Sequence, residues 1–142
     1  MKRMHSVTYF KVFSILVTVG VVFSFGGLYP LQHRVMGQSG WTAPESAKAV
    51  KNPVKADAAS LAKGQELYRA NCATCHGNKG EGDGPMAKRL KVKPASIKSA
   101  IKGQTDGELF WKISEGKPPM PPFKSSLKEA DRWAIVNYIR SL

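Results

Sequence analysis

The chain has 142 residues, which leaves room for one domain of ordinary size plus an appendage and excludes a second such domain. Its formal net charge is +12, from 22 Lys and Arg residues against 10 Asp and Glu residues. A positive surplus of this size favours an acidic partner, which can be a protein, an anionic membrane surface or a nucleic acid.

The N-terminal part contains a long uncharged stretch. Residues 12–33 include no Lys, Arg, Asp or Glu, and the apolar run within them extends to Pro30. At about 1.5 Å rise per residue, a helix of this length crosses the hydrocarbon core of a bilayer. Three basic residues precede the run and only Arg34 follows it closely, which keeps the N-terminus in the cytoplasm. We expect residues 1–31 to form a single-pass anchor, with residues 12–31 in the bilayer.

A cleaved signal peptide is the alternative for this segment, because its basic start fits a signal peptide equally well. The apolar stretch is long for a signal core, however, and no A-x-A cleavage site follows it. Ser24-Phe25-Gly26 is a poor substitute. We therefore favour a retained anchor.

Residues 32–56 show neither a helical nor a strand period. Gly37, Gly40, Pro44 and Pro53 interrupt them, and polar residues fill much of the remainder. This composition predicts a flexible tether between the anchor and the domain that follows at residues 57–142.

The stretch 58–71 predicts the first helix of that domain. Leu61, Gly64, Leu67 and Tyr68 recur at three- and four-residue steps and therefore share one face. A glycine within a helix costs about 1 kcal/mol relative to alanine. Gly64 therefore indicates a close backbone contact with another helix.

Residues 72–76 read C-A-T-C-H, which is the spacing of a c-type haem attachment site. Two thiols add to the two vinyl groups of one haem, and the following histidine offers an imidazole to the iron. A zinc site needs further Cys or His ligands, but the only other histidines are His5 and His33 in the N-terminal part. A redox dithiol usually lies in a βαβ pattern, which is absent. We expect one covalent haem c on Cys72 and Cys75, with His76 as an iron ligand.

Residues 77–85 contain four glycines and one proline and predict an irregular loop around the haem edge. A phosphate-binding loop is excluded, because no strand precedes it and no Gly-Lys-Ser/Thr closes it. Four basic residues crowd positions 88–93, either as solvated surface or as part of a docking patch. A nucleic acid partner is not expected, because a haem protein outside the cytoplasm rarely meets one.

The C-terminal half predicts two more helices with a stiff loop between them. Thr105 and Glu108 form a capping box that opens the first of these helices, and Gly116 ends it. Four prolines then occupy residues 118–122. Ser126 and Glu129 form a second capping box, which predicts that the last helix starts at Ser126 and runs to Ser141.

From about Ala58 to Leu142, the chain resembles the single-haem class I cytochromes c. The matching residues are Gly64, Tyr68, Cys72, Cys75, His76, Gly84, Pro85, Met120 and the stretch from Trp133 to Tyr138. The resemblance implies an all-α domain of three to four helices around the haem, in which the first and last helices pack together. It also implies that Met120 is the sixth iron ligand and that the Pro85 carbonyl accepts a hydrogen bond from Nδ1–H of His76.

These features predict an electron carrier rather than an enzyme, since both axial positions of the iron would be filled and no small-molecule substrate could bind. We expect the protein to carry single electrons between membrane redox complexes of a respiratory or photosynthetic chain. Its place would be the bacterial inner membrane, with the haem domain on the periplasmic side. One alternative is a fixed cytochrome subunit of a large complex. Another is a haem enzyme or gas sensor with an open sixth position, but the domain has no second histidine for such chemistry.

Overall fold

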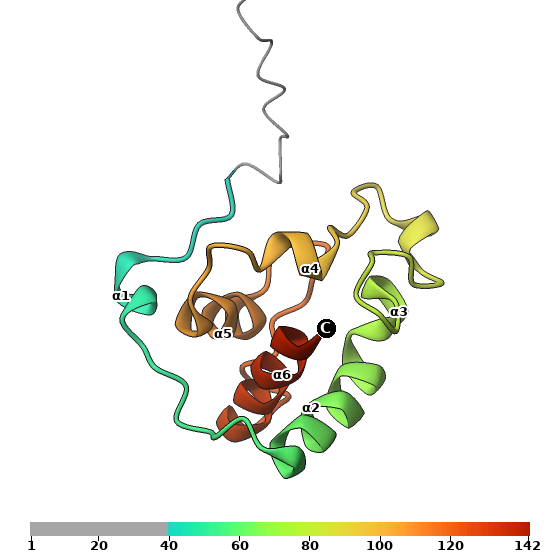
Figure 1. Cartoon of the computed structure of the whole chain (residues 1–142). Coiled ribbons are helices and arrows are strands. Elements are labelled where there is room, and N and C mark those ends of the chain that lie inside the picture. Colours follow the sequence, from blue (N-terminus) through green and yellow to red (C-terminus); the bar gives the residue numbers. More distant parts are fainter. Residues whose placement is uncertain (1–39) are drawn as a thin grey trace, which may run out of the picture. The chain divides into compact units, whose positions relative to one another are not determined.

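The structure is a computed structural model, and it describes residues 40–142. In this part the helices are α1 (Glu45–Lys48), α2 (Ala58–Asn71), α3 (Ala73–His76), η1 (Ala87–Arg89, a 3₁₀ turn), α4 (Ile97–Ala100), α5 (Asp106–Glu115) and α6 (Glu129–Ser141) (Figure 1). The expected all-α fold is therefore confirmed for the described residues. The predicted anchor at residues 1–31 lies outside them, and no helix within residues 40–142 has the length and apolar character to cross a membrane.

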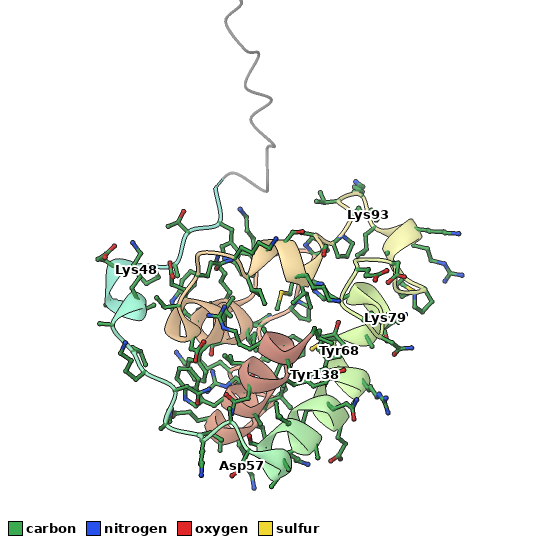
Figure 2. The ribbon with its side chains drawn as sticks, in the orientation of Figure 1. Lys48, Asp57, Tyr68, Lys79, Lys93 and Tyr138 are labelled. Carbon is green, nitrogen blue, oxygen red and sulfur yellow. The ribbon has the colours of Figure 1, made fainter. Side chains whose placement is uncertain are left out.

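Helices α2 and α6 lie side by side and form the centre of the fold (Figure 1). A Cβ atom at Gly64 would lie 2.1 Å from the carbonyl oxygen of Ala134, so only glycine permits this approach. One turn further, the buried rings of Tyr68 and Tyr138 meet with their centroids 5.3 Å apart (Figure 2). The contact predicted from the mid-helix glycine is thus confirmed.

Local signals set the start of two of the three long helices. Asp57 caps α2 and forms a capping box with Ser60. Thr105 caps α5, and Glu108 completes that capping box as predicted. The box predicted at Ser126 is wrong, because α6 begins at Glu129 and its N-cap residue, Lys128, makes no side-chain cap.

The prediction of a flexible tether over residues 32–56 is wrong from residue 40 onward, because this segment packs on the domain. Ala43 and Ala47 are buried, and α1 contacts α5. Asn52 donates a hydrogen bond to the side chain of Asn137 in α6 at 2.8 Å. Small side chains and hydrogen bonds to Asn137 hold the segment, and neither produces a local period. The boundary predicted at residue 57 therefore does not separate packed from unpacked chain.

Candidate haem site

Helix α2 leads directly into the C-A-T-C-H motif, whose first residue, Cys72, is the C-cap of α2. The backbone then turns once more as α3, and the N–H groups of Cys75 and His76 donate to the carbonyl of Cys72 at 3.1 and 2.9 Å. Both cysteines are half-buried free thiols. The motif is thus one compact helical turn that ends at His76.

The loop after the motif folds back and bonds to it. Its N–H groups donate to three consecutive carbonyls of the motif. The bonds are Met86 to Thr74 at 2.9 Å, Gly84 to Cys75 at 3.2 Å and Gly82 to His76 at 2.9 Å. A Cβ atom at Gly84 would lie 2.4 Å from the carbonyl oxygen of Thr74, so glycine is required for this contact. The glycine-rich loop therefore holds the backbone of the motif in place.

A buried tyrosine adds a further bond to this turn, which the sequence analysis missed. Tyr68 is fully buried, and its hydroxyl donates to the carbonyl of Gly77 at 2.7 Å. Burial raises the pKa of Tyr68 above its ordinary value, so the hydroxyl keeps its proton. The available signal was the residue type, since a tyrosine at a buried helix position needs a partner for its hydroxyl.

The electrostatics of Cys72 oppose a role as a redox dithiol. Burial, followed by the nearby Cys75, raises the pKa of Cys72 to about 12. A reactive dithiol needs a thiolate and therefore a lowered pKa. Cys72 lacks that feature, in agreement with a structural or cofactor-binding role.

The ring nitrogen Nδ1 of His76 is buried and makes no hydrogen bond within the described residues. The hydrogen bond to the Pro85 carbonyl is therefore not formed in this structure. Pro85 is exposed, and the residues on either side of it bond the motif through their N–H groups. Burial lowers the pKa of His76, while the backbone of Ala95 opposes this shift. The neutral imidazole that results is the form that binds iron.

Met120 lies on a tight proline-rich loop between α5 and α6. Lys117 and Met120 exchange two backbone hydrogen bonds, at 3.0 and 2.8 Å, across the cis Pro118-Pro119 bond. Met120 is half-buried and packs against the hydrophobic core. Cys72 packs against the same core from the other half of the domain. The loop thus holds a thioether on the core that also bears the motif.

These residues fit a covalent haem. Two free thiols stand at the required spacing on a rigid turn, and the histidine beside them has a buried nitrogen without a partner. Together with the α2–α6 pair, the motif defines a class I cytochrome c domain that carries one haem.

The family model described as cytochrome c oxidase, cbb3-type, subunit III, matches residues 59–139, which is more than half of the chain. The chain belongs to this family. Its cysteines at positions 72 and 75 imply covalent haem c, and the chain is an electron-transfer cytochrome rather than an enzyme.

Individual relatives agree with this assignment. The chain is 32% identical over 83 residues to cytochrome c6 of Cladophora glomerata, which covers 58% of this chain and 89% of the relative. It is 27% identical over 108 residues to the cytochrome bc1 complex cytochrome c subunit of Corynebacterium diphtheriae, covering 75% of this chain but 36% of that subunit. Among solved structures, a reducing HAO-like protein complex of Kuenenia stuttgartiensis matches with a TM-score of 0.58 and 25% identity, over 65% of this chain and 48% of that chain.

Proposed function

We propose that the protein carries single electrons between membrane redox complexes, with the haem iron bound by His76 and Met120. The observation that supports this most directly is the pairing of donors: a neutral imidazole on the motif and a thioether on a stiff loop, both on one small domain. When bound, the haem would supply a one-electron iron couple. Ligation by histidine and methionine raises its reduction potential relative to a haem with two histidine ligands. Residues 40–142 have no histidine besides His76 that could act on a substrate.

The role of the chain's own residues is to keep the ligands in place while the charge of the iron changes. Cys72 and Cys75 attach the haem, and the loop bonds fix the turn that ends at His76. The prolines around Met120 restrict its loop, because each proline fixes a backbone φ angle. A site that moves little between two charge states suits an electron carrier. With His76 and Met120 both bound, the iron would have no open coordination position.

Two measurements on the purified full-length protein test this function. A redox titration should give one reversible one-electron transition of the haem, and the ferrous protein should bind carbon monoxide slowly or not at all. Rapid carbon monoxide binding would instead support a haem enzyme or gas sensor with an open sixth position.

The anchor forms part of this proposal. Residues 12–31 would cross the inner membrane once and place the haem domain on the periplasmic side, as the uncharged stretch and the basic residues before it favour. N-terminal sequencing of the protein isolated from membranes decides the point. An intact N-terminus together with resistance to alkaline extraction supports the anchor, whereas a start near Gly27 would show that the segment is cleaved.

A fixed subunit of a respiratory complex is the second candidate. It is favoured by the packed segment at residues 40–57, which leaves less chain free for swinging than a flexible tether would. The match to a subunit of the cytochrome bc1 complex also favours it. Purification in mild detergent followed by mass spectrometry separates the two cases, because a fixed subunit co-purifies with large membrane subunits and a mobile carrier does not.

A further inference from the structure

Positive charge is concentrated in one stretch of the domain, residues 86–102, which we call the basic segment. It contains six basic and no acidic residues, whereas the other described residues contain 12 basic and 10 acidic ones. The six are Lys88, Arg89, Lys91, Lys93, Lys98 and Lys102. All are exposed, and none takes part in an ion pair or a side-chain hydrogen bond within residues 40–142. Most of the net charge of the domain is therefore free to act on a partner.

The basic segment is fixed beside the haem motif. At its start, the N–H of Met86 donates to the carbonyl of Thr74, which lies between the two cysteines. Near its end, the N–H of Ile97 donates to the carbonyl of Gly80 at 2.6 Å. Figure 2 shows Lys93 on the same side of the domain as Lys79 in the loop after α3, with Lys48 on the opposite side. A partner bound to the segment would thus lie next to the residues that carry the haem.

The segment also exposes an apolar side chain among its cations. Val92 is 56% exposed and is one of two exposed large hydrophobic residues in the described part of the chain. It lies between Lys91 and Lys93. Protein interfaces combine an apolar centre with a polar rim. Val92 with a lysine on either side has this pattern over three residues.

We propose that the basic segment is the docking surface for an acidic face of a redox protein, which exchanges electrons with the haem. This inference rests on the proposed electron-carrier function and specifies its partner. Complementary charge raises the rate of encounter and orients the partner, with an effect that salt weakens. An anionic bilayer is the less suitable occupant. Basic clusters also attract anionic lipid headgroups, but the helical turns here, η1 and α4, are too short to bury an amphipathic face in a bilayer.

Two charge-reversal variants of the full-length holoprotein test the proposal. Lys91→Glu/Lys93→Glu changes the basic segment, and Lys51→Glu/Lys55→Glu makes the same change in net charge elsewhere. All four lysines are exposed and none is in an ion pair of the described residues, so both variants should fold. The measurement is the rate of haem oxidation by detergent-solubilised redox complexes from the membranes of the source cells, followed by stopped-flow absorbance as the salt concentration is varied.

The wild-type rate should fall as salt rises. The variant in the basic segment should react about 10-fold more slowly at low salt and lose most of its salt dependence, while the control variant stays within about twofold. Equal effects of the two variants would overturn the proposal, since net charge alone would then explain the rate. An effect seen only with complexes in anionic lipid vesicles, and not in detergent, would assign the segment to the membrane and also overturn it. Unchanged reduction by ascorbate and an unchanged haem spectrum in both variants separate a failure of docking from a failure of the electron-carrier function.

Discussion

Gly64→Ala tests the contact between α2 and α6 on which the domain is built. Two effects of opposite sign compete in this variant. Alanine stabilises a helix interior by about 1 kcal/mol relative to glycine. The new methyl group, however, would lie 2.1 Å from the carbonyl oxygen of Ala134 and 2.8 Å from Cβ of Tyr138. Neither of these atoms is the end of a flexible side chain, so the two helices must move apart.

Overpacking of a well-packed core costs about 1–3 kcal/mol, and a clash with backbone belongs at the upper end of this range. After the gain in helix propensity, Gly64→Ala should lower the free energy of unfolding by about 2 kcal/mol. Ala62→Gly is the matched control, because Ala62 is exposed on the same helix and its change should cost about 1 kcal/mol through propensity alone.

The assay is guanidinium unfolding of the ferric holoprotein, followed by far-ultraviolet circular dichroism and by haem absorbance. A Gly64→Ala protein more stable than wild type would refute this reasoning, since propensity would then outweigh packing.

Three further outcomes follow from buried polar groups. Tyr68→Phe removes the hydroxyl that donates to the Gly77 carbonyl and should lower the free energy of unfolding by about 1 kcal/mol, because this carbonyl still accepts from the N–H of Gly80. Tyr138→Phe is the control and should be neutral, because it loses no such bond. Equal losses in the two variants would contradict this prediction. Burial raises the pKa of Tyr68, so the folded state holds the hydroxyl proton more tightly than the unfolded state does. The stability that this difference contributes is complete below about pH 10 and is lost as the pH rises beyond that value. A pH series of the unfolding free energy should therefore show a smaller loss in Tyr68→Phe than in wild type. Asn137→Ala removes the hydrogen bonds that hold residues 52–60 and should cost about 3 kcal/mol and speed proteolysis of the segment at residues 40–57, whereas Asn71→Ala, at an exposed site, should do neither.

Features that depend on residues close together in the sequence, such as a motif, a helix cap or a helix span, were predictable from the sequence. The C-A-T-C-H motif, the capping box at Thr105 and the span of α2 each depend on a few consecutive positions. Gly64 was informative because a glycine inside a helix is unfavourable unless another backbone lies close to it. Gly64 predicted a close contact with another helix, and the resemblance to class I cytochromes c identified the last helix, α6, as the partner.

Features that depend on distant partners were not predictable in this way. Asn52 and Asn137 are 85 positions apart, and neither suggests the other, so residues 40–56 were interpreted as a tether.

Two local expectations also differ from the structure. The pattern at Ser126 satisfies the capping-box rule, but α6 starts three residues later. For Pro85, the resemblance to class I cytochromes c implied that its carbonyl accepts a hydrogen bond from His76, whereas in the structure Nδ1 of His76 has no partner among the described residues and the residues beside Pro85 donate their N–H groups to the motif.

The central claim is that a covalent haem is ligated by His76 and Met120, and the absorbance spectrum of the ferric full-length protein tests it most directly. The wild type should show the long-wavelength band of methionine bound to iron, and Met120→Ala should lose it. Met86→Ala is the control, because Met86 lies in the loop after the motif and should leave the band unchanged. A wild-type protein without the band, or a band that survives in Met120→Ala, would contradict this account.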